Sequence, residues 1–93
     1  MASAASPPFT ELQGQYLAFI HAYALINGRP PAEADMQRFF GVTPPSVHNM
    51  VKTLERLGFI TRQPRQSRSI ALVVPEDGLP RLRQPIKSSG TGY

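Results

Sequence analysis

The sequence predicts a mainly α fold in which three helices precede a small β-hairpin. Three stretches carry apolar side chains at helical spacing, each stretch ends at a glycine, and two β-rich runs around a polar loop follow the last one. The 93 residues, 41% of them hydrophobic, suffice for one domain, which without any cysteine must be held together by apolar packing. We expect that domain at residues 9–75, between a disordered tail at 1–8 and a flexible tail at 76–93.

The first helix is predicted at residues 11–26. Thr10 and Gln13 form a capping-box pattern at its start. The apolar positions that follow share one helical face: Leu12, Tyr16, Phe19, Ile20, Tyr23 and Ala24. Asn27-Gly28 ends the helix, and Arg29-Pro30-Pro31 then requires an extended connection, because a helix cannot run through these prolines.

A shorter second helix is predicted at residues 32–40. Glu33 and Asp35 lie in its first turn, where carboxylates interact favourably with the helix dipole. Met36 and Phe40 place an apolar pair on one face, and the glycine that comes next ends the helix.

The third helix, at residues 44–57, has the clearest pattern. Thr43 is a good N-cap, and the two prolines after it are tolerated in a first turn because the N–H groups there have no partner within the helix. The apolar side chains form one continuous stripe, made of Val47, Met50, Val51, Leu54 and Leu57. Gly58 terminates the helix.

Two β-rich runs follow, at residues 59–63 and 69–74, and a polar loop joins them. The second run alternates, with Ile70, Leu72 and Val74 on one face. Two helices joined by a short turn and followed by a hairpin are the arrangement of a winged helix-turn-helix. The predicted fold is therefore three helices plus a two- or three-stranded wing.

Charge is distributed unevenly along the chain. Residues 1–51 hold two basic side chains against three acidic ones, whereas residues 52–93 hold eight basic against three acidic. Residues 56–74 contain four arginines and no acid. A one-sided basic surface suits a polyanion, because the phosphates of DNA provide most of its non-specific affinity. From charge alone, a solvated basic face that only keeps the protein soluble explains the pattern equally well.

The third helix is the candidate reader of double-stranded DNA. A major groove about 12 Å wide accepts one helix, while the helix before it braces against the backbone. Asn can pair with adenine, and Arg or Lys with guanine or phosphate, so we expect Asn49, Lys52 and Arg56 to enter the groove. The full candidate set for this helix is Thr43, Pro45, Ser46, His48, Asn49, Lys52, Thr53 and Arg56.

The loop of the hairpin supports this interpretation. Every helix has a polar outer face, so the composition of the third helix alone proves little. The loop adds Arg65, Ser67 and Arg68 at a position where a wing would meet phosphates or the minor groove. We therefore expect sequence-specific binding of double-stranded DNA.

Several short motifs stand in a fixed order between residues 9 and 74. They are Phe9-Thr10, Asn27-Gly28-Arg29-Pro30-Pro31, Gly41-Val42, Leu54-Glu55-Arg56-Leu57-Gly58-Phe59-Ile60 and Arg68-Ser69-Ile70-Ala71-Leu72. In this order and spacing they resemble the DNA-binding domain of LexA-type repressors. The resemblance implies a winged helix, operator recognition by the third helix, repression of transcription, and a place at the nucleoid in the bacterial cytoplasm.

The sequence also departs from that family. LexA-type repressors carry a C-terminal self-cleaving domain with a Ser-Lys dyad, and this sequence ends before one, has no Ala-Gly pair, and holds only Lys52 and Lys87 as lysines. We expect no autocleavage. Since that domain also holds the family's dimers together, both a monomer and a homodimer on DNA remain open. Gln37 and Phe39 replace a small and a polar residue, and Phe39 is expected to pack at a helix end rather than mark a partner surface.

Other function classes find little support. His21 and His48 are not at ligand spacing, so we expect no metal or other cofactor. Ser67 and Ser69 lack a titratable partner other than arginines, and no glycine-rich phosphate loop is present, so neither an enzyme nor a small-molecule site is expected. The longest apolar stretch, at 16–26, is far shorter than the roughly 20 residues of a membrane span, and no secretory signal precedes it, which favours a cytoplasmic protein.

Two competing functions stay open. A winged helix can serve as a protein-interaction adaptor without specific DNA binding, in which case the basic arc is merely solvated. RNA binding is less well supported, because the sequence shows no aromatic platform on which unpaired bases could stack.

Overall fold

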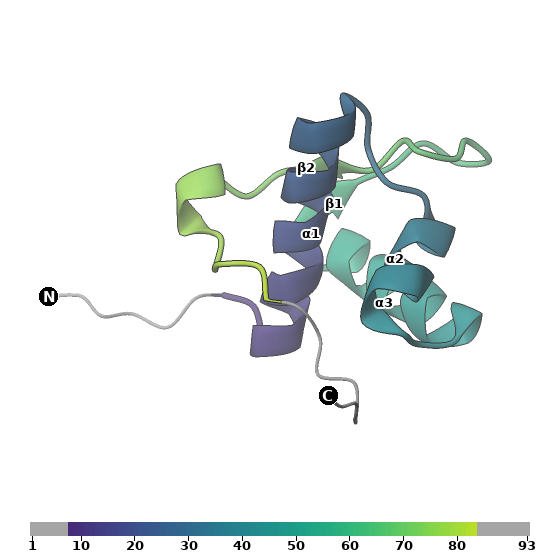
Figure 1. Cartoon of the computed structure of the whole chain (residues 1–93), viewed down its shortest axis with the longest axis horizontal. Helices are drawn as coiled ribbons and strands as arrows, with labels where there is room; N and C mark the ends of the chain where they lie inside the picture. The colour runs from purple at the N-terminus through teal and green to yellow at the C-terminus, as the bar shows by residue number, and fades with distance from the viewer. Residues whose placement is uncertain (1–7, 84–93) are drawn as a thin grey trace, which may run out of the picture.

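The computed structural model describes residues 8–83 and shows three helices followed by a two-stranded hairpin (Figure 1). The elements are α1 (Glu11–Asn27), α2 (Glu33–Phe40), α3 (Pro44–Arg56), β1 (Ile60–Thr61), β2 (Ala71–Leu72) and the short 3-10 helix η1 (Glu76–Gly78). This order confirms the predicted fold class. The tail predicted at 1–8, except Pro8, and residues 84–93 of the second tail lie outside the described residues. None of the helices in the described part is both long and apolar enough to span a membrane.

Hydrogen bonds confirm the predicted starts of the first and third helices, whereas α2 begins at Glu33, one residue after its predicted start. At α1, the Thr10 N–H donates to Gln13 Oε1 at 2.9 Å, and the Gln13 N–H donates to Thr10 Oγ1 at 3.1 Å. At α3, Thr43 Oγ1 accepts from the Ser46 N–H at 3.4 Å, ahead of the two prolines of the first turn. Each hydroxyl satisfies an N–H that has no partner inside the helix.

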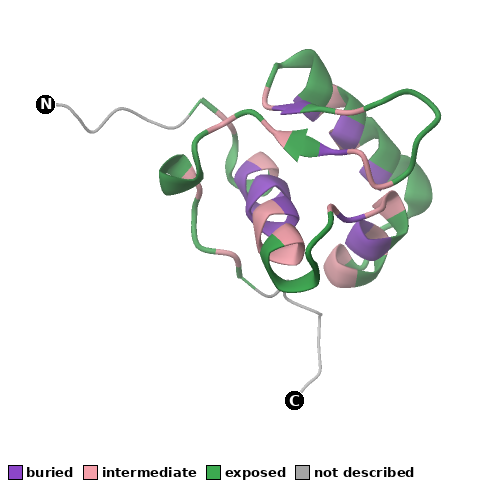
Figure 2. Ribbon diagram, turned by 90° about the horizontal axis from the view of Figure 1, so that it is seen from above, coloured by how far each residue is buried: buried purple, intermediate pink, exposed green. Residues whose placement is uncertain are grey.

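All three helices and both strands contribute to one core (Figure 2). Its buried members are Tyr16, Leu17, Phe19, Ile20, Met36, Val47, Val51, Leu54, Ile60 and Ile70. Two predicted core positions are wrong: Leu12 is 55% exposed and Leu57 is 45% exposed. Leu12 lies about 140° around the helix from Leu17, which is fully buried and was not predicted. Leu57 comes after the last residue of α3, where the chain already turns toward Gly58.

Aromatic side chains fill the space between α1 and α2. Phe39 stacks on Phe19 with ring centroids 4.7 Å apart, and Phe40 stacks on Tyr16 at 4.2 Å. Such pairs contribute about 0.5–1.5 kcal/mol beyond the area they bury. Phe39 thus packs at the helix end, as predicted, and the alternative of an exposed partner surface is not supported.

The hairpin is antiparallel, with Ile60 opposite Leu72 and Thr61 opposite Ala71. The predicted alternation in the second run is confirmed, because Ile70 is buried while Leu72 and Val74 pack against the core. Both strands are shorter than the predicted runs.

A side chain shortens the ladder at its loop end. The Gln63 N–H donates to Ser69 Oγ at 2.9 Å instead of to a carbonyl of the opposite strand. The same hydroxyl donates to the Gln66 carbonyl at 2.9 Å. Backbone pairing therefore gives way to a closed loop after Thr61.

Residues 76–83 do not behave as the flexible tail that the sequence predicts. They run along the side of α1 that faces away from α2 and α3 (Figure 1). Gln15, although polar, is buried, and it donates to the Arg81 carbonyl at 3.0 Å and accepts from the Arg83 N–H at 2.8 Å. Leu79 and Leu82 pack against the core, so the ordered domain extends beyond the predicted boundary at 75.

Candidate nucleic-acid interface

The outer surface of α3 gathers the residues predicted to read DNA. Val47, Val51 and Leu54 are fully buried, which turns the opposite face of the helix toward solvent (Figure 2). That face exposes Pro45, Ser46, His48, Asn49, Lys52 and Arg56, with Thr53 partly exposed at its edge. Thr43 is also exposed, but its hydroxyl caps the helix and lies 3.0 Å from Ser46 Oγ. The structure therefore brings the whole predicted helix set onto one surface.

A shallow hollow lies at the C-terminal half of this surface. Its lining combines five residues of α3 with one from the hairpin: Asn49, Lys52, Thr53, Glu55, Arg56 and Arg62. Lys52 and Arg56 thus border the same hollow as an amide and a hydroxyl, beside the ion pair of Arg62 and Glu55. This combination can donate to phosphate oxygens and to the acceptors on base edges.

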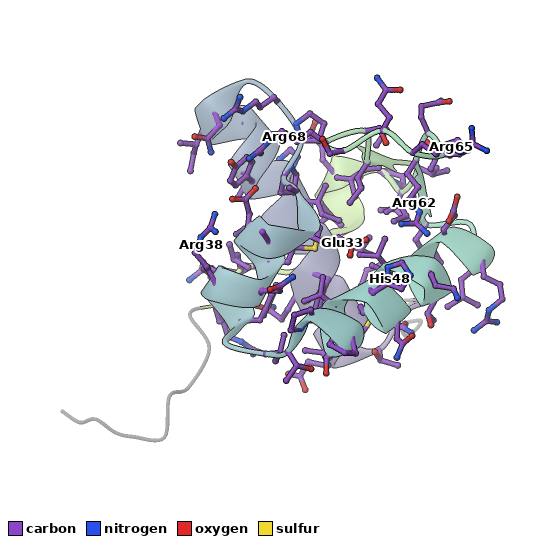
Figure 3. The ribbon with its side chains drawn as sticks, turned by 90° about the vertical axis from the view of Figure 1, so that its right-hand side faces the viewer. Glu33, Arg38, His48, Arg62, Arg65 and Arg68 are labelled. Carbon is purple, nitrogen blue, oxygen red and sulfur yellow. The ribbon has the colours of Figure 1, made fainter. Side chains whose placement is uncertain are left out.

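Arg62 connects three elements and was missed by the sequence prediction. Its Nε donates to Glu55 Oε1 at 2.9 Å, and its Nη1 donates to Glu33 Oε2 at 3.3 Å. His48 Nδ1 lies 3.4 Å from the Glu33 carboxylate, so both helices of the helix-turn-helix meet here (Figure 3). The one signal in the sequence that could have found Arg62 is its position directly after β1, a few residues beyond the end of α3.

The loop of the wing holds Arg65 and Ser67 exposed. Arg65 has φ +60°, a left-handed conformation that is uncommon outside glycine. Figure 3 shows its side chain toward the outer end of the hairpin loop. These two residues occupy the position that the sequence predicts for the wing.

Arg68 lies elsewhere than the prediction placed it. Its Nη1 donates to Asp35 Oδ2 and to the Tyr23 hydroxyl, each at 3.0 Å, and to the Pro30 carbonyl at 3.4 Å. The guanidinium also sits over the Tyr23 ring, 5.9 Å from its centroid. Arg68 is therefore held by acceptors from α1, α2 and their connection, whereas the sequence analysis expects it beside Arg65 as a DNA contact of the wing.

Asp35 is the buried partner in this contact. Its carboxylate also accepts from the Ala32 N–H at 2.8 Å and from Arg38. Burial alone would raise the pKa of Asp35, but the Ala32 N–H and the charges of Arg68 and Arg38 outweigh burial and lower the pKa below its ordinary value of 3.8. Asp35 is thus a buried, ionised carboxylate that joins α2 to the wing. Within residues 8–83, no three His, Asp or Glu side chains gather closely enough to hold a metal ion.

Comparison with known proteins decides the family. The model of the LexA DNA-binding domain matches residues 6–69. This chain belongs to that family. Over 70 residues it is 41% identical to the LexA repressor of Thermosipho melanesiensis, and the matched region covers 75% of this chain and 35% of that protein. The LexA repressor of Thermosipho africanus is 44% identical over 64 residues, covering 69% of this chain and 32% of that protein.

A more distant relative extends further along the chain. The LexA repressor of Thermobifida fusca is 29% identical over 82 residues, which cover 87% of this chain and 32% of that protein. This chain thus spans about a third of the length of the LexA repressors that it matches. Membership of the LexA DNA-binding domain family confirms the resemblance read from the motifs, and the winged helix-turn-helix with it.

Proposed function

We propose that this chain is a transcriptional regulator, and not an enzyme, that binds double-stranded DNA in a sequence-specific way and represses transcription. The observation that carries the proposal is the exposed polar face of α3, which is backed by a fully buried stripe on a LexA-family fold. The core fixes the direction of this face, so its donors need little rearrangement before they meet base edges.

The proposed roles follow from position on that face. Asn49, Lys52 and Arg56 enter the major groove and contact base edges or adjacent phosphates. The residues at the edges of the contact are Thr43, Pro45, Ser46, His48 and Thr53, and the wing contributes Arg65 and Ser67 to the backbone contact. A DNA site with two-fold symmetry would be bound by two such domains, one on each half-site, as a homodimer.

Asn49→Ala and Arg56→Ala test the reading face. Each substitution is expected to weaken binding to a duplex selected from a random pool by about 1–3 kcal/mol, and to relax the preference at one base pair. Fluorescence anisotropy against a panel of duplexes, each changed at one position, measures both effects. Arg81→Ala is the matched control, because it removes an exposed arginine from the segment on the far side of α1. Wild-type binding by both α3 variants would show that α3 does not read the DNA.

A further inference from the structure

We infer that Arg68 is a positioning residue for the wing: through Asp35 and Tyr23 it holds the loop at the orientation in which Arg65 meets the DNA backbone. This inference rests on the proposed function and deepens it, because it assigns the two arginines of one loop to different tasks. Arg65 contacts the phosphate, and Arg68 supports Arg65 without touching DNA.

The contacts of Arg68 tie the wing to α1, to α2 and to the connection between these two helices. Tyr23 belongs to α1, Pro30 to the connection that follows it, and Asp35 to α2. The side chain of Asp35 is only 8% exposed. Withdrawing Arg68 toward a phosphate would leave this carboxylate without one of its two charged partners, and such a loss in a buried site is costly. The ion pair with Asp35 therefore favours the observed position of Arg68 over one in which it contacts a phosphate.

The loop behaves as one closed unit because its ends are joined by a single side chain. Ser69 Oγ is bonded to the backbone of both Gln63 and Gln66, and the Gln66 N–H donates to the Gln63 carbonyl at 3.3 Å. The ladder beneath the unit has only two residues in each strand, and a short two-stranded hairpin has little stability of its own. The orientation of the loop must therefore be set by side chains.

Both flanks of the loop are pinned to the first turn of α2. Arg62, before the loop, is paired with Glu33, and Arg68, after it, is paired with Asp35. The two acidic residues that the sequence assigns to the helix dipole thus also hold the wing. Because α2 packs directly against α3, the same helix sets the relation between the reading surface and the wing.

Arg65 is left as the cation that faces outward from this unit. It is exposed, and among the described residues no carboxylate lies within ion-pair distance of it. Arg68 has φ +55°, a left-handed conformation that its three acceptors help to hold. We expect that loss of the anchor frees the loop and costs the phosphate contact of Arg65.

A double-substitution cycle in the full chain tests this coupling through the salt dependence of DNA binding. The four proteins are wild type, Arg65→Ala, Arg68→Met and the double variant, each titrated with the selected duplex at several salt concentrations. A phosphate contact contributes about 0.9 to the slope of log K against log salt concentration. Arg65→Ala is expected to lower the slope by about that amount in the wild type, and by less than a third of it in the Arg68→Met background.

Four other results would overturn the inference. If Arg65→Ala lowered the salt slope equally in both backgrounds, Arg68 would only stabilise the fold. If, in addition, Arg68→Met lowered the slope by a separate amount of its own, Arg68 would itself contact a phosphate. If Arg65→Ala did not lower the salt slope in the otherwise wild-type protein, Arg65 would make no phosphate contact for Arg68 to support. If the wild-type protein did not bind DNA at all, the proposed function would also be wrong. Failure of the proposed function is thus distinguished from failure of the inference alone.

The conservative variant keeps the test open if Arg68→Met does not fold, which circular dichroism would show. Arg68→Lys retains the charge, but one ammonium lacks the planar fork that serves all three acceptors. In this background, Arg65→Ala is expected to lower the slope by less than half of its wild-type effect. An undiminished effect would overturn the inference.

Discussion

Leu54→Ala is expected to lower the free energy of unfolding by about 2–5 kcal/mol, the range for truncation of a buried leucine. Leu54 is fully buried, and it shares the core with Val51 of the same helix and Ile60 of β1. The cavity would lie at the point where α3 meets the hairpin, two elements that are in direct contact. Since small domains are stable by only about 5–15 kcal/mol, this loss takes a large share of the total. Urea unfolding followed by circular dichroism measures it.

Leu57→Ala is the matched control for this experiment. It removes the same atoms from the same stretch of chain, but Leu57 is 45% exposed, so the expected change is much smaller. A loss as large as that of Leu54→Ala would mean that α3 is rotated differently against the core. The face that carries Asn49 and Arg56 would then also point elsewhere, so the pair of variants tests the geometry on which the proposed function depends.

Asp35→Asn is expected to lower the free energy of unfolding at neutral pH by about 1.5–3 kcal/mol, the range for hydrogen bonds to a charged group. An amide oxygen can still accept from the Ala32 N–H, but the charge that pairs with Arg68 and Arg38 is lost. The side chains of these arginines are 32% and 71% exposed, so water compensates part of the loss and keeps it below that of a fully buried pair.

The same substitution has a pH signature that separates charge from shape. The pKa of Asp35 is lower in the folded protein than its ordinary value of 3.8, so ionised Asp35 adds stability that is fully present above that value. The contribution is lost as the pH falls through the lower, folded-state pKa. The difference between wild type and Asp35→Asn is therefore expected to be constant near neutral pH and to shrink below 3.8. Unfolding curves across this range measure it.

Glu11→Gln provides the control for a solvated ion pair. Glu11 pairs with Arg83 at 3.0 Å, but the two side chains are 80% and 59% exposed, so the expected loss is at most about 1 kcal/mol. If Asp35→Asn changed stability no more than Glu11→Gln does, Asp35 would not be the anchor that its contacts suggest.

Features that depend on neighbouring residues could be predicted from the sequence. Thr10 and Thr43 each cap a helix by bonding to the residue three positions further on. The glycines that end the helices do so through their own left-handed backbone conformation. The stripe along α3 needs only the helical period, and the polar face of α3 follows from it because it is the opposite side. The exposed candidate set on α3 is for this reason the best predicted part of the site.

Features that depend on distant partners could not be predicted in this way. Arg68 bonds to Asp35 and Tyr23, which precede it by 33 and 45 residues, and no local pattern links them. Buried Gln15 is an exception to the exposure of polar side chains, and its partners lie 66 and 68 residues away. The segment that it fixes therefore looked like a tail, although Leu79 and Leu82 reach the core.

The most direct test of DNA reading by this domain is the affinity of the wild-type chain for duplexes selected from a random pool, measured at several salt concentrations. Specific binding predicts enrichment of one sequence, with an affinity that exceeds that for random duplex and falls steeply as salt rises. A two-fold symmetric sequence would show that two copies bind. No enrichment, together with no salt-dependent binding even at low salt, would contradict the proposal and favour a protein-interaction adaptor.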